Sequence, residues 1–320
     1  MGGKRPAGSR SHTVDRSDSL PSVLGIVVVS YGSAELLRTH LASVDRAAMR
    51  TVTAVVVVDN LRSAPAQDEV RRCADEYGWN LLTNPTNQGF GAAANQGLDR
   101  ALALGCTAVV LLNPDADADG ELLDALAEET VRSPRSLVSP RIVRPDGRPW
   151  FSGGGMDLRR GWTLNRVQPA EPCSDGWLTG ACLAASADLW RDLGGFDEDY
   201  FLYWEDVDLS YRCTRAGGTL LVRGDLEAVH DVGGTQGAGK SAVYYRYNCR
   251  NRLLFAAKHM PRPTVCRWLV YTPAYARRVL LRGGRRQLVR SPGLVWAAVR
   301  GSCSGAARAA RAAVSTAGRP

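Results

Sequence analysis

The alternation of short apolar runs with amphipathic segments in the first third of this chain restricts its fold most. Each run is rich in valine, isoleucine and leucine without polar interruption, which predicts a strand buried on both faces. Apolar residues between the runs recur at helical spacing, as crossovers between parallel strands do. We predict an α/β fold: a mostly parallel sheet with helices on both faces. The predicted strands are 24–30, 52–58, 79–83 and 108–112, and the predicted helices are 34–46, 67–77 and 92–104.

Polar residues directly follow all four predicted strands. Because the carboxyl ends of parallel strands meet at one edge of a sheet, these residues should line one crevice, where open α/β sheets bind ligands. Asp115 follows Pro114, which ends its strand because it has no N–H. A carboxylate held there suits a divalent cation that in turn holds a diphosphate, and Asp59 suits the donors of a nucleoside. The strand-end residues are Tyr31, Asp59, Asn60, Asn84, Asn87, Asn113 and Asp115.

Two structural alternatives compete for Asp115. The first is a helix cap, but Asp119 is better placed to cap a helix over 121–127, so this stretch leaves capping and function equally open. The second is a calcium loop, because the acids from Asp115 to Asp119 match the start of an EF-hand. That loop needs a bidentate Glu at its twelfth position, where this chain has Leu126. We therefore reject the calcium loop.

The loop 84–91, after the third predicted strand, contains glycines that let backbone approach a ligand or a neighbouring element closely. Gly89, Gly91 and Ala94 also match the GxGxxA fingerprint of dinucleotide-binding folds. The match follows the third strand instead of the first, and the chain lacks a second nucleotide-binding half. A nicotinamide or flavin oxidoreductase is therefore disfavoured.

The densest acidic cluster of the chain lies at 197–208, before and at the start of a helix predicted over 209–216. Acids at a helix start are favourable for the helix dipole, which is the structural explanation. Aromatic residues directly before them, Trp204 included, favour a sugar site instead. Asp206 and Asp208 are two residues apart and cannot point the same way. We expect one to face a site while the other holds an arginine or a backbone N–H.

A strand predicted over 176–186 is lined with small residues, which suits a wall against which a sugar or a phosphate lies. Two short strands are predicted at 220–223 and 227–230, and the second ends at His230. A lone histidine is usually structural or on the surface. Here a neutral imidazole beside a metal held by Asp115 would complete the protein ligands of that metal.

Composition bounds the remaining possibilities. The 320 residues suffice for one large or two modest domains, and no run of about 18 apolar residues predicts a transmembrane helix. Residues 1–22 lack the apolar segment of a secretory signal, and we expect them to be disordered. The eight cysteines are scattered without a CxxC pair. This favours buried thiols in a reducing cytoplasm over disulfides or a zinc site.

The net charge of +8 is unevenly distributed. Residues 232–320 hold 17 of the 40 lysines and arginines and no acid, so the rest of the chain holds 23 basic and 32 acidic residues. A basic segment implies an anionic partner. Apolar and tryptophan-containing patches alternate with arginine after residue 264, which favours an anionic membrane surface over nucleic acid. The structural alternative is a helical bundle packed on the body.

Taken together, the motifs resemble those of the family 2 glycosyltransferases, in particular the bacterial rhamnosyltransferase-like members that extend polyprenyl-linked or cell-wall glycans. The resemblance covers roughly residues 23–260 and rests on the order and spacing of the motifs. They are 26–31, 56–60, 84–91 with Asn95, 111–115, 179–181, 194–197 and 204–209. The resemblance implies a GT-A-like nucleotide-sugar-binding fold and an inverting sugar transfer that depends on Mg²⁺ or Mn²⁺.

By the same resemblance, Asp206 would be the general base, and Asp115 with His230 would hold the metal. The chain departs from the family pattern at Asn113, which replaces the first Asp of the DxD motif, and at Gly32, where Asn is common. Metal binding therefore leans on Asp115 and His230. The donor-binding residues would be Tyr31, Asp59, Asn60, Asn87, Gly89 and Asn113. The acceptor-side candidates are Trp204, Glu205 and Trp177.

The predicted function is that of a hexosyltransferase. It would move a sugar, rhamnose by resemblance to the subgroup, from a nucleotide-diphosphate sugar to a hydroxyl of a glycan or polyprenyl-linked acceptor. The alternative is a non-catalytic nucleotide-sugar or glycan-binding subunit of a glycan-assembly complex. The joint presence of Asp115, Asp206 and His230 argues against that alternative.

These expectations divide the chain into three parts. A tail, 1–22, precedes a GT-A-like domain, 23–240, whose halves are a nucleotide-binding part (23–118) and an acceptor part (119–240). A basic, helical extension, 241–320, completes the chain and is expected to contact the anionic membrane. We expect a cytoplasmic protein, peripheral on the inner face of the plasma membrane, with no nucleic-acid partner.

Overall fold

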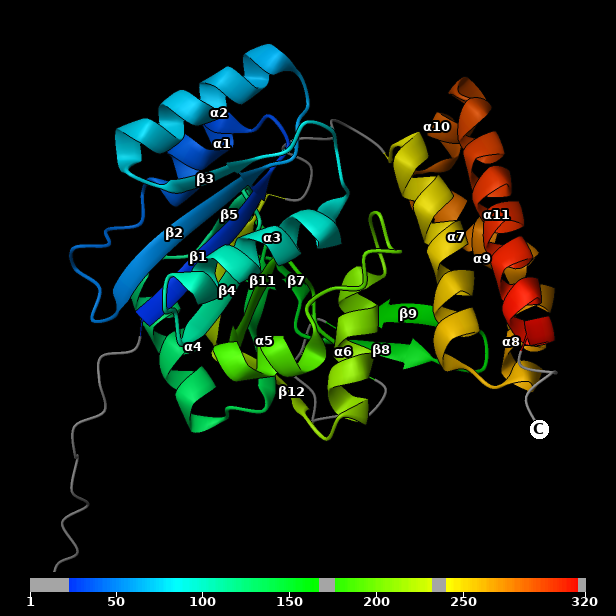
Figure 1. The fold of residues 1–320 in the computed structure, drawn as a ribbon. Coiled ribbons are helices and arrows are strands. Elements are labelled where there is room, and N and C mark those ends of the chain that lie inside the picture. Colours follow the sequence, from blue (N-terminus) through cyan, green and yellow to red (C-terminus); the bar gives the residue numbers. More distant parts are fainter. Residues whose placement is uncertain (1–22, 167–175, 232–239, 316–320) are drawn as a thin grey trace, which may run out of the picture.

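The computed structural model describes residues 23–166, 176–231 and 240–315, so the predicted tail 1–22 lies outside the described residues. Its centre is a nine-stranded mixed sheet with strand order β3-β2-β1-β4-β11-β6-β12-β5, and β7 pairs with β6. Helices cover both faces of this sheet, and a group of C-terminal helices lies to one side (Figure 1). The predicted α/β class is confirmed.

The first four strands pair in parallel, as predicted. On the first of them, Leu24, Ile26 and Val28 enter one hydrophobic core, while Val27 and Val29 enter the other. Alternate residues of a strand point to opposite faces, so an uninterrupted apolar run fits a strand covered on both sides. The strands are β1 (Val23–Ser30), β2 (Val52–Asp59), β3 (Asn80–Thr83) and β4 (Ala108–Leu112).

The helices between these strands are present with shifted ends. The predicted helix 34–46 is shorter: α1 (Ala34–Leu36) continues as one π-helical segment, η1 (Leu37–Leu41), after which the chain turns. α2 (Ala64–Tyr77) begins earlier than predicted because the Ser63 hydroxyl accepts from the Ala66 N–H and caps it. α3 (Phe90–Ala103) follows the 84–91 loop.

The second half of the chain completes the sheet. β11 (Cys182–Ser186) joins β4 antiparallel, and β12 (Thr219–His230) runs parallel to β6 (Ser136–Val143). Two predictions were wrong here. The strand expected over 176–186 is interrupted after Trp177, and the two strands expected over 220–230 form one strand with an irregular register between Arg223 and Glu227.

The remaining elements of the body surround this sheet. α4 (Gly120–Arg132) begins at Asp119, whose carboxylate accepts from the Leu122 N–H, as predicted. The helix expected over 209–216 starts earlier, at the acids themselves. The other elements are α5 (Ala187–Leu193), α6 (Glu205–Arg215), β5 (Ala116–Asp117), β7 (Pro149–Phe151), and the small sheet of β8 (Gly154–Asp157), β9 (Trp162–Asn165) and β10 (Gly176–Trp177).

The basic extension folds into helices packed on the body, the structural alternative weighed above. α7 and α11 run side by side (Figure 1). They approach closely at Gly301, where a Cβ atom would lie 2.0 Å from the carbonyl oxygen of Arg246. Within the described ranges, every helix is too short or too polar to cross a membrane. The helices are α7 (Ala242–His259), α8 (Arg262–Val270), α9 (Thr272–Leu281), α10 (Arg285–Arg290) and α11 (Gly293–Ser315).

Candidate active site

Hydrogen-bonded side-chain amides connect the ends of β2 and β3 with the loop 84–91, at the edge of the sheet where the sequence predicted a crevice. The Asn60 side-chain amide donates to Asn87 Oδ1 at 3.0 Å and to the Gly89 carbonyl at 2.9 Å. Its Oδ1 accepts from the Gln88 N–H at 2.9 Å and from Asn84 Nδ2 at 3.2 Å. These bonds fix the 84–91 loop against the sheet edge, so the predicted role of Asn60 and Asn87 in donor binding would be exerted largely through the loop they shape.

Asp59 ends β2 beside this loop and is fully buried. Neither of its carboxylate oxygens has a hydrogen-bond partner of good geometry among the described residues. Burial raises the pKa of Asp59, and the nearby Gln67 side chain and Gly32 backbone oppose that rise. A buried acceptor without a partner is costly unless a ligand supplies donors. Asp59 is therefore suited to receive the N–H or O–H groups of a nucleoside.

The backbone conformation and packing at Gly32, near Asp59, explain why this position holds glycine and not the Asn that is common in the family. Gly32 has φ +65°, and a Cβ atom on it would lie 2.9 Å from the Arg62 Cβ and 3.0 Å from the Ala66 Cβ. A side chain at this position would be both strained and crowded. The neighbouring Tyr31, which directly follows β1, is half exposed, so its ring is open to a ligand.

Asp115 and His230 lie together although 115 residues separate them in sequence. β5 pairs with the end of β12, so that His230 stands opposite Ala116, and the Asp231 N–H donates to the Asp115 carbonyl. His230 Nε2 is 3.0 Å from Asp115 Oδ1, and both side chains are largely buried. The indole of Trp150 packs on the imidazole with 5.1 Å between ring centroids.

This pair can supply two ligands to a divalent cation, one carboxylate oxygen and one imidazole nitrogen. The described residues contain no group of three or more His, Cys, Asp or Glu side chains placed to hold a metal. Mg²⁺ is usually bound through one or two carboxylates together with waters and substrate phosphates. Asp115 and His230 therefore fit a cation whose other positions are filled by a diphosphate and water, and they do not form a closed structural metal site.

Asp206 lies in the first turn of α6, partly exposed to solvent. Its Oδ1 accepts from the Val207 N–H at 2.8 Å, and its Oδ2 accepts from the Gly180 N–H at 3.4 Å. Burial raises the pKa of Asp206 to about 6, and these N–H donors oppose the rise. A carboxyl group with a pKa in this range exchanges protons readily near neutral pH, as a general base must.

One short segment connects Asp206 to the strand-end residues. The Ala181 carbonyl accepts from the Asn113 N–H at 2.9 Å, while the adjoining Gly180 N–H points to Asp206. The segment lies where the predicted strand 176–186 is interrupted. It brings the start of α6 close to the turn that directly follows β4. This turn carries Asn113 and Asp115.

Asp208 has the other role expected for this pair of acids. It is fully buried, and its oxygens accept from Arg212 Nε and His259 Nε2, each at 2.6 Å. Burial alone would raise its pKa, but the His259 hydrogen bond and the Arg212 charge outweigh burial and hold the pKa below its usual value. Asp206 and Asp208 thus point in different directions. Asp208 connects α6 to α7 through His259, and it orients Arg212, whose guanidinium donates to the Leu193 and Gly195 carbonyls of the body.

The three acceptor-side candidates lie inside the protein. Trp204 is 3% exposed among Phe255, Trp268 and Tyr275, Glu205 is 6% exposed, and Trp177 is 9% exposed. Burial raises the pKa of Glu205 well above its usual value, which favours a neutral carboxyl. These positions suit core residues better than contacts to an acceptor. The C-terminal helices cover Trp204, and Phe151 of the body packs on Trp177.

The chain conformation before Asp206 is unusual. Tyr203 and Trp204 have φ of 68° and 76°, the left-handed region that side chains rarely adopt. Each such residue costs about 1–3 kcal/mol and persists only where its surroundings enforce it. Sequence reasoning missed this strain, as it missed Trp150 and Asn251. Trp150 lies in a stretch without a recognisable motif, and Asn251 lies in a helix whose polar residues carry no spacing signal.

Comparison with known proteins gives consistent matches. A family model described as glycosyl transferase family 2 matches residues 25–184. The chain is 28% identical over 268 residues to the N-acetylglucosaminyl-diphospho-decaprenol L-rhamnosyltransferase of Mycobacterium tuberculosis, covering 75% of this chain and 86% of that protein. It is 25% identical over 241 residues to a low-salt glycan biosynthesis hexosyltransferase of Haloferax volcanii, covering 72% and 74%.

Two solved structures share the fold. GalNAc-T7 with UDP, GalNAc and Mn²⁺ superposes with a TM-score of 0.57 at 16% identity, covering 75% of this chain and 48% of that one, so the present chain spans about half of it. The mannosyltransferase PcManGT of Pyrobaculum calidifontis with GDP-Man and Mn²⁺ gives 0.51 at 18% identity, covering 94% and 88%.

Proposed function

Since this chain belongs to glycosyl transferase family 2 and is a glycosyltransferase with a GT-A fold, we propose that it is an inverting, metal-dependent enzyme. It moves a sugar from a nucleoside diphosphate to a hydroxyl of a glycan or lipid-linked acceptor. The observation that carries the proposal is the Gly180–Ala181 segment, which contacts both Asp206 and the Asn113–Asp115 turn. It supports the proposal because it joins Asp206, whose pKa burial raises to about 6, to the turn that carries Asn113 and Asp115.

The donor nucleoside occupies the crevice at the ends of β1, β2 and β3. Asp59 accepts hydrogen bonds from the base or ribose, since its buried oxygens are without partners of good geometry among the described residues. Tyr31 borders the same crevice with a half-exposed ring. Hydrogen bonds from Asn60 to Asn87 and Gly89 hold the 84–91 loop beside it. Asn113 directly follows β4 and is the remaining donor contact that we propose.

Asp115 and His230 would hold Mg²⁺ or Mn²⁺, and the 3.0 Å between their side chains supports this assignment. When bound, the ion acts as a Lewis acid that offsets the negative charge growing on the departing diphosphate. Both structural relatives described above were solved with Mn²⁺. Trp150 covers one side of the imidazole and keeps His230 in place.

Asp206 removes the proton of the attacking hydroxyl, a contribution of ~10²–10⁴-fold. The attack and the departure of the diphosphate form a single displacement, so the anomeric centre inverts and no covalent enzyme intermediate is needed. The Gly180 and Val207 N–H groups orient the carboxylate while burial keeps it basic. The test is Asp206→Asn, which should abolish transfer and leave nucleotide binding unchanged; persistent transfer would refute the assignment.

Rhamnose is the proposed donor sugar. The two relatives that support it are the mycobacterial rhamnosyltransferase and a dTDP-rhamnosyl transferase of Shigella flexneri, 22% identical over 218 residues. The mycobacterial enzyme is named for an N-acetylglucosaminyl-diphospho-decaprenol acceptor, which supports a polyprenyl-linked acceptor here. The non-catalytic subunit is the competing function, and it predicts nucleotide binding without transfer in any acceptor mixture.

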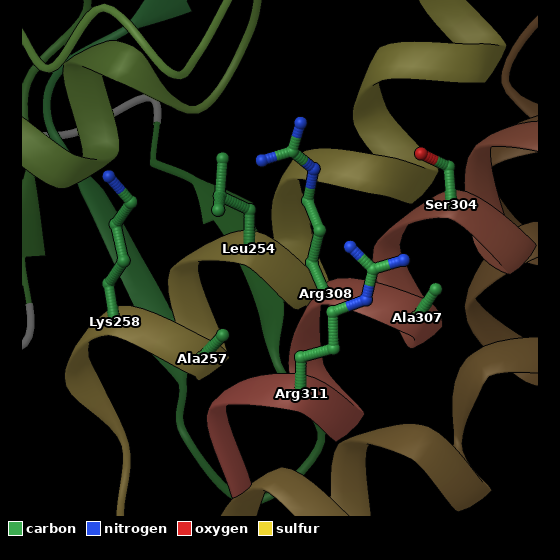
Figure 2. A pocket seen from close by; sticks show the side chains of 7 residues that line it. All are labelled: Leu254, Ala257, Lys258, Ser304, Ala307, Arg308 and Arg311. Atoms are coloured by element: carbon green, nitrogen blue, oxygen red, sulfur yellow. The ribbon is translucent and has the colours of Figure 1, made fainter. Parts of the chain in front are cut away.

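The C-terminal helices are proposed to meet an anionic membrane surface. An open groove of about 560 Å³ lies between α7 and α11, where Arg308 and Arg311 extend from α11 beside Ala257 of α7 (Figure 2). Neither arginine has an ion-pair partner within the part of the chain that the structure describes. Trp296, on the same helix, is 62% exposed. Guanidinium groups together with an exposed indole suit lipid phosphates at a membrane interface.

A further inference from the structure

Asn251 is a buried polar residue of α7 that the proposed chemistry does not use. Its side chain is 0% exposed, and its amide nitrogen donates to two successive carbonyls of the body, those of Leu202 at 2.9 Å and Tyr203 at 2.7 Å. Both carbonyls belong to the turn that leads into α6. One side chain of the C-terminal helices thus satisfies two backbone acceptors a few residues before Asp206.

The turn that Asn251 holds is the strained one. Tyr203 and Trp204 are consecutive non-glycine residues with left-handed φ, and the Asp208 N–H then donates to the Trp204 carbonyl to begin the helix. Without a glycine, this conformation persists only if surrounding contacts enforce it. Side-chain capping of α6 does not contribute, because Trp204 makes no such bond. The two hydrogen bonds that Asn251 donates are placed to enforce this conformation.

The neighbouring residues of α7 hold the same segment on either side. Arg250 Nη1 donates to the Asp199 carbonyl at 3.0 Å and also to Asn251 Oδ1, which orients the amide. Lys258 pairs with Asp197 and Asp199, and His259 holds Asp208. Four side chains of one helix therefore contact a segment that starts before the turn and ends just past Asp206.

We propose that Asn251 is a positioning residue for sugar transfer: by holding the Leu202 and Tyr203 carbonyls, it keeps the strained turn in the one conformation that places Asp206 against Gly180. This inference rests on the proposed role of Asp206. It assigns α7 a part in the chemistry of a domain whose family model ends at residue 184. The Asn251 bonds end at the Leu202 and Tyr203 carbonyls, whereas the donor loop contacts the preceding residue, where the Phe90 N–H donates to the Phe201 carbonyl. Loss of Asn251 therefore affects turnover much more than nucleotide binding.

The test compares Asn251→Ala and Asn251→Asp with Asn248→Ala in the full-length enzyme. Asn248 is a matched control, because it is nearly as buried on the same helix and, among the residues that the structure describes, its amide donates only to the Tyr244 carbonyl of that helix. Asn251→Asp keeps the shape and replaces the two donated bonds with an acceptor facing two carbonyls. We expect both Asn251 variants to lower kcat at least tenfold, with the nucleotide dissociation constant within twofold of wild type and Asn248→Ala near wild type.

Three results would overturn the inference. One is an unchanged kcat in folded Asn251 variants, and another is an equal loss of kcat in Asn248→Ala. The third is unfolding of both Asn251 variants while Asn248→Ala stays folded, which would make Asn251 a residue of global folding. Failure of the proposed function would look different. In that case the wild-type enzyme itself would transfer no sugar.

Discussion

His230 Nε2 lies 3.0 Å from Asp115 Oδ1, because the last residues of β12 pair with the short strand β5 that directly follows the Asn113–Asp115 turn. The two side chains are 115 residues apart in the sequence, and this antiparallel pairing brings their backbones together. A register shift of one residue would turn His230 to the other face of the sheet. The geometry of the proposed metal pair is therefore set by backbone pairing.

His230→Ala should raise the Mn²⁺ concentration needed for half-maximal transfer by ~10–100-fold, since one of two protein ligands is lost. The measurement is a Mn²⁺ titration of transfer activity at fixed donor concentration. His40→Ala is a matched control, because His40 pairs with Asp117, two residues from Asp115, without contacting the proposed site. An equal shift in both variants would contradict the role of His230 as a ligand.

The activity should depend on pH through Asp206. With a pKa of about 6, the carboxyl is the active base only when ionised, so kcat should fall ~10-fold per pH unit below 6 and level off above it. The free energy of unfolding should depend on pH in the opposite direction. The folded pKa lies above the ordinary 3.8, so the stabilising contribution of the proton is complete below 3.8 and is lost as pH rises through 6.

Two pH series check this account. One is kcat at saturating Mn²⁺, and the other is the melting temperature of wild type and Asp206→Asn over the same range. The variant should lack the part of the stability change that falls between pH 4 and 6 in the wild type. A kcat that stays constant down to pH 5 would exclude Asp206 as the base.

Asp59→Ala should weaken nucleotide binding by ~10–100-fold, because each lost hydrogen bond to a charged group costs ~1.5–3 kcal/mol. The melting temperature without ligand should stay constant or rise, since the variant removes a buried carboxylate whose oxygens lack partners of good geometry. Isothermal titration with the nucleoside diphosphate measures the first effect. The control is Asp68→Ala, because Asp68 is exposed on α2 and pairs with Arg71. If Asp59→Ala left the dissociation constant of the nucleotide unchanged, Asp59 would not belong to the donor site.

The double variant Arg308→Glu/Arg311→Glu should bind anionic vesicles at least ~10-fold more weakly, given ~1 kcal/mol for each basic residue near a charged surface. Sedimentation with phosphatidylserine-containing and neutral vesicles measures this. Arg144→Glu/Arg148→Glu makes the same charge change on the body, away from the groove between α7 and α11. Equal losses in the two double variants would show that overall charge, and no local surface, governs binding.

Sequence patterns predicted the first half of this domain well. β1, β2 and β4 are apolar at most positions because both of their faces are covered, whereas the edge strand β3 is only partly buried. A short run of residues is enough to reveal this coverage. The split between Asp206 and Asp208 was also predictable, since two acids two positions apart cannot share a direction. In both cases the constraint is local.

What escaped prediction depends on distant packing. Trp204 and Glu205 were predicted to contact an acceptor, but both are buried, and residues of α7, α8 and α9 pack around Trp204. The interruption of the strand over 176–186 follows from contacts of Gly180 and Ala181 with Asp206 and Asn113. Asn251 was missed because its partners are backbone carbonyls some 50 residues away, which no side-chain pattern records.

The most direct test of the central claim is the thermal stability of the protein with UDP, TDP and GDP, each with and without Mn²⁺. At ~100 times its dissociation constant, a ligand adds ~2.7 kcal/mol to the free energy of unfolding. We predict that one of the three diphosphates stabilises the protein selectively and only with Mn²⁺, and that His230→Ala removes the metal dependence. No stabilisation of folded protein by any of them, or stabilisation that is the same without the metal, would contradict a metal-dependent nucleotide-sugar transferase.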